Sequence, residues 1–262
     1  MDYVYLRYLK FEFLRYFIEL SYKGTNYHGW QIQPDVISVQ QKVNEAFSKI
    51  LNDTIICNAA GRTDTGVHAS QMFIHIDTDK TINTVDFIYK LNAVLPDDIV
   101  IHALKKVNKE AHTRFDATSR SYEYKIFLGR NPFLLDTTWQ IYQQKLDVKK
   151  MNEAAAILLN YTNFKCFSRS KTDVRTYNCD ITNAEWKLEN RILTFHITAD
   201  RFLRNMVRAI VGTLVAIGKN KININDFVKI IESQNRSQAG TSAPAQGLTL
   251  TSVTYPESIY ND

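Results

Sequence analysis

The sequence predicts an α+β fold of two lobes, each a mixed, mostly antiparallel sheet covered by helices. Three observations lead to this prediction. Short stretches alternate apolar and polar residues, apolar residues recur at helical spacing between those stretches, and the whole pattern begins again after about residue 130. Strands and helices interspersed in this way are typical of sheets packed against helices. We therefore expect an N-terminal lobe over residues 15–130 and a C-terminal lobe over residues 131–256.

The predicted N-terminal lobe contains two helices among its strands. The first helix is expected over residues 38–51, because Ser38 is a favourable N-cap and Gln41 stands where a capping box needs it. A second amphipathic helix over residues 84–95 is stopped by the proline that follows it. Strands are expected at residues 15–22, 54–60, 70–77, 98–107 and 119–128.

In the C-terminal lobe, Asp147 is expected to cap a helix that continues to residue 160. Residues 184–198 predict a hairpin with its turn at residues 189–191. Residues 201–218 predict a strongly apolar helix with Arg201, Arg204 and Arg208 on one face, since spacings of three, four and seven residues coincide on a helix. A shorter helix at residues 226–233 and a loop and strand within residues 242–256 complete the lobe.

Composition limits the classes of protein to consider. The 262 residues are 45% hydrophobic, as in globular proteins, and neither a membrane-spanning run nor a signal peptide is expected. Three widely spaced cysteines argue against a disulfide framework or a four-thiolate zinc site and favour a reducing, cytoplasmic location. With 32 Lys and Arg against 27 Asp and Glu, the net charge of +5 is compatible with an RNA partner without demonstrating one.

A single carboxylate, Asp64, lies in the loop AAGRTDTGVHA at residues 59–69. An aspartate in such a loop is commonly a turn residue that binds its own backbone. Here, however, Arg62 and His68 lie close in sequence, and two glycines free the backbone to approach a ligand. The loop therefore leaves two interpretations open, a turn residue or a reactive group.

Metal binding is an alternative for the same region, because Asp64, His68 and His75 could supply oxygen and nitrogen ligands to a metal-dependent hydrolase, with Asp77 as a fourth. In a strand over residues 70–77, however, His75 and Asp77 share a face while His68 lies in the preceding loop. Paired metal-binding motifs are also absent from the sequence. We expect no metal.

Arg208 stands deep inside the apolar run of the predicted helix, whereas Arg201 and Arg204 are expected to be solvated. A buried guanidinium requires a carboxylate, because removing one partner of a buried ion pair costs about 3–5 kcal/mol. Since the neighbouring residues supply no acid, the partner must come from elsewhere in the chain. Asp64 is an available candidate.

Two further segments suit contact with RNA. On the strand at residues 119–128, Arg120, Tyr122 and Tyr124 would point to one side, which suits base stacking with phosphate contact, although a core strand is equally compatible. Residues 163–177 interleave basic and aromatic residues, as an RNA-binding loop or an ordinary solvated segment would. The basic residues of this second segment are Lys165, Arg169, Lys171 and Arg175.

Several segments resemble, in the same order, those of the tRNA pseudouridine synthase A family. GRTDTGVHA is similar to the catalytic signature of that family, and the resemblance runs from about residue 15 to residue 256. Thr65 departs from the alanine that the family usually has, and residues 1–14 lie outside the pattern. The other similar blocks are YKGTNYHGWQIQP, RFDATSRSYEYKI, FLRNMVRAIVGTL and AGTSAPAQGLTL.

The resemblance implies a pseudouridine synthase fold with a central cleft, and isomerisation of uridine to pseudouridine in the anticodon arm of tRNA, at positions 38, 39 and 40. It implies Asp64 as nucleophile, Tyr122 stacked on the target base, Arg208 paired with the catalytic carboxylate, and Arg62 helping to unstack the base. It implies no cofactor, and a homodimer with tRNA lying across both subunits. The alternatives are a non-catalytic RNA-binding protein and the metal-dependent hydrolase using Asp64, His68 and His75.

Overall fold

The computed structural model describes residues 13–169 and 174–260 of the chain. In its first half, Ser38 Oγ accepts a hydrogen bond from the Gln41 backbone N at 3.2 Å, so the predicted N-cap is confirmed. The Gln41 side chain donates to Glu45 instead of returning to the cap. The predicted strand at residues 54–60 shortens to two residues. The elements of this half are α1 (Val39–Leu51), α2 (Thr84–Val94), β1 (Leu14–Tyr22), β2 (Asn58–Ala59), β3 (His68–Thr78), β4 (Ile99–Val107) and β5 (Ser119–Phe127).

The second half also begins its first helix at a predicted cap, because the Asp147 carboxylate accepts a hydrogen bond from a first-turn backbone N at 3.1 Å. The predicted hairpin forms as well. Its turn residues Asn190 and Arg191 have φ of 47° and 67°, the positive values that a type I′ turn requires. The elements of this half are β6 (Trp139–Gln140), α3 (Val148–Ile157), β7 (Ile181–Glu189), β8 (Ile192–Ala199), α4 (Met206–Gly218), α5 (Ile224–Ser233) and β9 (Leu248–Thr254).

Helix α4 is shorter than the predicted helix over residues 201–218. The prediction is wrong at the N-terminal end, because Asn205 adopts a left-handed conformation with φ of 64° that interrupts helical geometry. Arg201 and Arg204 therefore lie in the loop before α4 and do not continue a helical face with Arg208.

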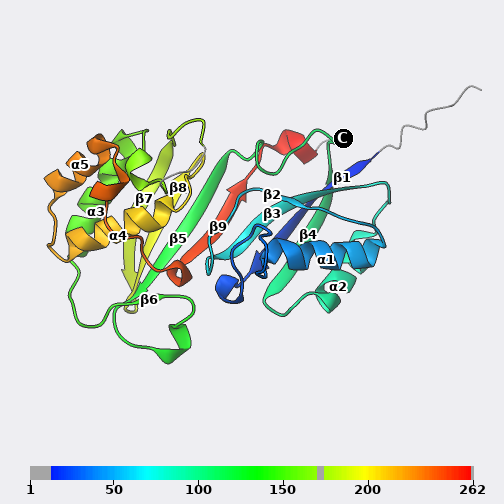
Figure 1. The fold of residues 1–262 in the computed structure, drawn as a ribbon, viewed down its shortest axis with the longest axis horizontal. Coiled ribbons are helices and arrows are strands. Elements are labelled where there is room, and N and C mark those ends of the chain that lie inside the picture. Colours follow the sequence, from blue (N-terminus) through cyan, green and yellow to red (C-terminus); the bar gives the residue numbers. More distant parts are fainter. Residues whose placement is uncertain (1–12, 170–173, 261–262) are drawn as a thin grey trace, which may run out of the picture.

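The strands form one sheet in the order β4-β1-β3-β9-β5-β8-β7, with β2 beside β3 and β6 beside β5. The β3–β9 and β5–β6 pairs are parallel, and the other neighbouring pairs are antiparallel. The α+β class with a mixed sheet and covering helices is confirmed. The sheets expected for the two lobes are joined into one, because the C-terminal strand β9 lies between β3 and β5 (Figure 1).

Two hydrophobic cores lie along this sheet, one with α1 and α2 and the other with α3, α4 and α5 (Figure 1). Tyr122 packs against both cores. The division into lobes at residue 130 stays a prediction. The two central strands cross that division, because β5 places Tyr124 in the C-terminal core and β9 contributes Leu248 to the C-terminal core and Leu250 to the N-terminal core.

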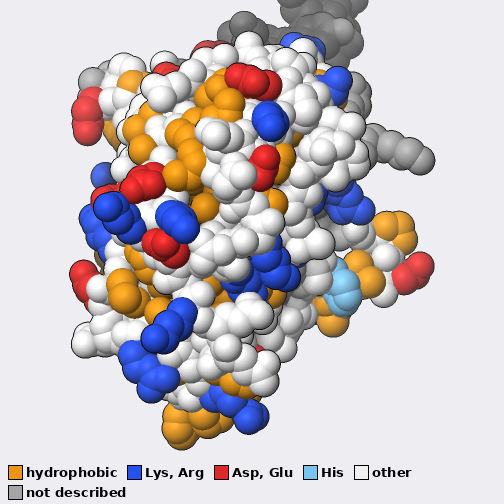
Figure 2. All heavy atoms as spheres, turned by 90° about the vertical axis from the view of Figure 1, so that its left-hand side faces the viewer, with side chains coloured by type: hydrophobic (Ala, Val, Ile, Leu, Met, Phe, Trp, Pro, Cys, Tyr) orange, Lys and Arg blue, Asp and Glu red, His pale blue; other side chains and the backbone are white. Residues whose placement is uncertain are grey.

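Figure 2 views the end of the molecule formed by the C-terminal helices, with hydrophobic side chains and several Lys and Arg side chains at its lower edge. The connection between β5 and β6 reaches this edge in Figure 1, and its Phe133 and Leu135 side chains are 93% and 56% exposed. Within the described residues, no helix has the length and apolar character needed to cross a membrane.

Candidate active site

Asp64 lies in the loop between β2 and β3, and this loop contacts the end of β1 and the loop that follows β1. The Trp30 backbone N donates to the Thr63 carbonyl at 3.2 Å, and the buried Tyr22 hydroxyl lies 2.8 Å from Thr63 Oγ1. Gly29 passes so close, with φ of 83°, that a Cβ there would stand 2.5 Å from the Thr63 carbonyl oxygen. The backbone on which Asp64 stands is therefore fixed.

Asp64 meets Arg208, 144 residues away in the sequence. Arg208 Nη1 lies 3.3 Å from Asp64 Oδ2, while Arg208 Nε donates to the Ala243 carbonyl at 2.8 Å and so fixes the guanidinium. The two side chains are only 24% and 20% exposed. A second cation, Arg204, has its Nε 3.9 Å from Asp64 Oδ1. Within the described residues, the carboxylate thus has two guanidinium neighbours, of which one is at hydrogen-bond distance.

Tyr122, in the middle of β5, is partly buried beside this pair. The Phe202 ring meets the Tyr122 ring edge to face, with centroids 5.1 Å apart. Burial raises the pKa of the Tyr122 phenol to about 12, with the Asp64 charge acting in the same direction and Arg120 opposing it. The phenol is therefore neutral at physiological pH and presents a flat apolar ring to the cleft.

Asp64, Tyr122 and Arg208 line a cleft of about 2120 Å³. Of the other residues expected to bind substrate, Arg62, Arg169 and Arg175 also line it. The described residues of the wall carry two aspartates against nine arginines, a charge balance suited to a polyanion. The arginines are Arg62, Arg114, Arg120, Arg169, Arg175, Arg201, Arg204, Arg208 and Arg236.

The remaining two expected binding residues differ. Lys165 is not part of the cleft wall, and its Nζ lies 5.5 Å from the centroid of the Tyr177 ring. Lys171 lies outside the described residues.

Comparison with known proteins finds similarity to one family. A family model described as tRNA pseudouridine synthase matches residues 154–256. The tRNA pseudouridine synthase A of Bacteroides thetaiotaomicron is 49% identical over 251 residues, which cover 95% of this chain and 93% of the relative. The enzyme of the same name from Porphyromonas gingivalis is 49% identical over 94% of this chain and 99% of its own length. That from Acetivibrio thermocellus is 38% identical over 90% and 97%.

The chain belongs to the tRNA pseudouridine synthase A family. The segments that resemble this family are the ones that surround the cleft: GRTDTGVHA holds Asp64, RFDATSRSYEYKI holds Tyr122, and FLRNMVRAIVGTL holds Arg208.

The histidines of the metal-site alternative have structural partners. His68 Nδ1 accepts a hydrogen bond from the Gly24 backbone N at 2.9 Å, and its Nε2 faces two backbone carbonyl oxygens. His75 Nδ1 lies 3.3 Å from the Thr113 backbone N and 2.8 Å from Thr113 Oγ1. Burial lowers the pKa of both rings, that of His75 to about 4. In the part of the chain that the structure describes, no three His, Cys, Asp or Glu residues lie together as a metal site, so the hydrolase alternative has no support.

The residues expected on one side of β5 have three different roles. Tyr124 is fully buried and donates from its hydroxyl to the Pro244 carbonyl at 2.7 Å, so it belongs to the core. Arg120 lines the cleft but donates to four backbone carbonyl oxygens. Of the three, Tyr122 lines the cleft with a ring whose hydroxyl makes no hydrogen bond to the described residues.

Sequence analysis missed part of the cleft wall. Arg204 is solvated as expected, with its side chain 57% exposed, but its approach to Asp64 was not expected and arises because α4 begins after it. Arg114 and Phe115 open the RFDATSRSYEYKI block, and this adjacent basic and aromatic pair is a signal that could have identified them. Arg236 enters the wall from the short 3₁₀ turn Arg236–Gln238 that follows α5, and nothing in its local sequence indicates that position.

Proposed function

We propose that the protein is a tRNA pseudouridine synthase that isomerises uridine to pseudouridine in the anticodon arm of tRNA, at positions 38, 39 and 40, with Asp64 as nucleophile. One observation carries the proposal: Asp64 and Arg208 pair inside an arginine-lined cleft. The family membership supports it, since relatives that cover nearly the whole chain are named tRNA pseudouridine synthase A.

The reaction rearranges one nucleoside. The bond between N1 of uracil and the ribose breaks, the base turns, and C5 bonds to the ribose in its place. C5 loses a proton and N1 gains one, so the product has the composition of the substrate and no oxidant, reductant or group donor is consumed.

Asp64 attacks C1′ of the ribose as the N1–C1′ bond breaks, and the bonding electron pair stays on the uracil. When C5 of the turned base bonds to C1′, the bond from Asp64 to C1′ breaks and the carboxylate is regenerated. A carboxylate nucleophile must be ionised and only partly hydrated. The Arg208 guanidinium, itself fixed on the Ala243 carbonyl, lies 3.3 Å from Asp64 Oδ2, and the Arg204 Nε lies 3.9 Å from Asp64 Oδ1.

Tyr122 stacks on the target uracil. Its pKa of about 12 keeps the phenol protonated near neutral pH, and we therefore assign it this stacking role in preference to removal of the C5 proton. Taking the base out of its helix costs a few kcal/mol, which stacking and phosphate contacts offset. The exposed Arg62, two residues before Asp64, helps to displace the base, while Arg169 and Arg175 contact phosphates.

We also propose that the protein acts as a homodimer with tRNA lying across both subunits, and that it works in the cytoplasm. Family resemblance supports the dimer, and three buried, unpaired cysteines suit a reducing compartment. A non-catalytic RNA-binding protein would explain the arginines, but it has no use for a shielded carboxylate–guanidinium pair.

The test is to map pseudouridine in tRNA from cells with and without this gene. We expect the modification at the anticodon-arm positions to disappear without the gene and to return when purified protein is added to that tRNA, with or without a metal chelator. An unchanged map, or a failure of the purified protein to restore the modification, would contradict the proposed function.

A further inference from the structure

The connection between β4 and β5 places an exposed aromatic side chain in the wall of the cleft. Phe115 is 74% exposed and lines the cleft. Its ring centroid lies 4.3 Å from that of His112, and the Arg114 guanidinium lies 5.7 Å from the Phe115 ring. An exposed phenyl ring contributes little to folding, because most of its apolar surface stays in water.

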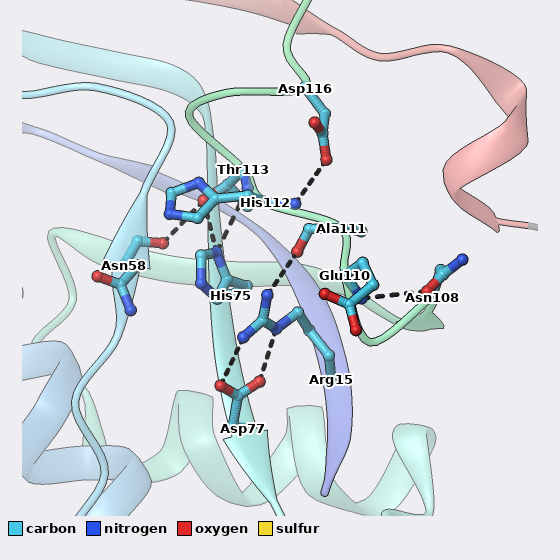
Figure 3. A network of polar contacts seen from close by, with 10 residues as sticks. All are labelled: Arg15, Asn58, His75, Asp77, Asn108, Glu110, Ala111, His112, Thr113 and Asp116. Carbon is cyan, nitrogen blue, oxygen red and sulfur yellow. Dashed lines mark hydrogen bonds and ion pairs between the residues drawn. The ribbon is translucent and has the colours of Figure 1, made fainter.

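The turn that carries Phe115 is held from several sides, as Figure 3 shows. Thr113 contacts His75 through both its backbone N and its hydroxyl, and its carbonyl accepts a hydrogen bond from the Tyr255 hydroxyl at 2.6 Å. Within the turn, the His112 backbone N donates to Asp116 Oδ2 at 2.7 Å. The ring is therefore presented on a fixed backbone, which lowers the entropy lost when a ligand stacks on it.

Arg120 joins this turn to the loop of the nucleophile. Its Nη2 donates to the Arg114 carbonyl at 2.6 Å and lies 3.4 Å from the carbonyl of Ala60, four residues before Asp64. Tyr122 follows two residues later on the same strand. Trp30 and Phe202 also line the cleft, but Trp30 is buried and Phe202 packs on Tyr122. The two aromatic positions relevant to a ligand are Tyr122 beside the carboxylate and the exposed Phe115 at the adjoining turn.

We propose that Phe115, backed by His112, stacks on an unpaired base of the RNA other than the target uridine, with Arg114 contacting the adjoining phosphate. This inference rests on the proposed function of the cleft, since it assigns a second base position to the same RNA. Stacking on an exposed ring tolerates any base, so Phe115 contributes affinity and register with little discrimination between bases.

The test compares Phe115→Ala with Phe133→Ala, a control that removes an even more exposed phenyl ring outside the cleft wall. We expect Phe115→Ala to raise the Kd and KM for tRNA by about 5- to 150-fold, the loss of about 1–3 kcal/mol of stacking, with kcat nearly unchanged. Phe115→Leu, which keeps an apolar side chain without a flat ring, should lose nearly as much. Phe133→Ala should leave Kd and KM unchanged. Wild-type Kd and KM in Phe115→Ala and Phe115→Leu would overturn the proposal.

A second measurement uses Phe115→Trp. We expect this variant to keep wild-type affinity and to show fluorescence quenching on tRNA addition beyond that of the native tryptophans in the wild-type protein. Equal quenching in the two proteins would contradict stacking. If the wild-type protein bound tRNA but formed no pseudouridine, the proposed function would fail while the affinity and fluorescence measurements would still decide whether Phe115 stacks.

Discussion

Two aspartate–arginine pairs in this molecule differ in how completely the carboxylate is satisfied. Arg15 donates two hydrogen bonds to the Asp77 carboxylate, of 2.6 and 2.7 Å, and its third nitrogen donates to the Ala111 carbonyl (Figure 3). Asp64 receives a single contact of 3.3 Å from Arg208 and a more distant cation at 3.9 Å.

The less exposed of the two carboxylates is the one with the weaker contacts. Asp77 is 43% exposed yet accepts a short hydrogen bond at each oxygen, whereas Asp64 is 24% exposed and has only a 3.3 Å contact at one oxygen and a 3.9 Å contact at the other. A shielded carboxylate with open coordination is unfavourable for folding, since buried polar groups are normally paired. We expect the first pair to contribute to stability and the second to serve the proposed reaction.

The largest effect should come from Arg208→Ala. It removes the cation that holds Asp64 and leaves the Ala243 carbonyl without its donor, so we expect pseudouridine formation to fall by about 10²–10³-fold. The free energy of unfolding should fall by about 1–3 kcal/mol, because hydrogen bonds to a charged group are lost. Turnover and thermal unfolding measure the two effects. The control is Arg208→Lys, which keeps the positive charge but not the planar guanidinium that contacts both the Ala243 carbonyl and Asp64; it should retain intermediate activity. A wild-type rate in Arg208→Ala would contradict the role of the Asp64–Arg208 pair.

In the Arg15–Asp77 pair, the matching change is Arg15→Ala. It should lower stability and leave activity near that of the wild type. We expect a loss of about 1–2 kcal/mol in unfolding free energy, discounted for the exposure of Asp77, while kcat stays near wild type. Lys42→Ala, which breaks an exposed pair with Glu45, should change stability by less than about 0.5 kcal/mol. A drop in kcat as large as that of Arg208→Ala would erase the distinction between the two pairs.

His75 and Asp77 should affect stability in different pH ranges. The pKa of His75 is lowered to about 4 in the folded protein, from an ordinary value near 6.5, so the unfolded chain binds a proton first. Stability should fall as pH drops from 6.5 to 4, with His75 contributing up to about 3 kcal/mol of that loss. Arg15 lowers the pKa of Asp77, so that carboxylate loses its contribution only at more acid pH.

Denaturant unfolding at several pH values between 7 and 4 checks this, with His75→Gln as the comparison. The variant should show a shallower dependence over that range, and the part that remains comes from His68 and His112, whose pKa values are also lowered by burial. An equally steep curve in His75→Gln would remove His75 from the explanation.

The smallest effect concerns the rim of the cleft. Arg175 is exposed and lines the cleft, whereas Lys165 is exposed outside it. Arg175→Ala should weaken tRNA binding uniformly and reduce the slope of log affinity against log salt by about 1, while Lys165→Ala leaves the slope nearly unchanged. Equal slopes for both variants would contradict the assignment of the cleft as the RNA path.

Local signals predicted the elements well. The caps at Ser38 and Asp147 and the turn at residues 189–191 depend on neighbouring residues, and each forms where the sequence indicates. The insertion of β9 between β3 and β5 depends on contacts between distant segments, so the pattern of the chain indicated two sheets where one exists.

The site was predicted less evenly. The pairing of Asp64 with Arg208 was predicted. It followed from the requirement of a buried guanidinium for a carboxylate and from the family resemblance. The start of α4 was not predictable, because Asn205 holds its left-handed conformation while its side chain donates to Ser242 Oγ, 37 residues away, at 2.6 Å. That distant contact decides where Arg204 lies.

The role of Asp64 is tested most directly by release of tritium from C5 of labelled uridine in tRNA, measured in a single turnover for Asp64→Asn and Asp77→Asn beside the wild-type protein. We expect Asp64→Asn to bind tRNA with near wild-type affinity, to unfold at a similar temperature and to release no tritium, while Asp77→Asn releases tritium at the wild-type rate from a less stable fold. Normal release by Asp64→Asn would contradict the account.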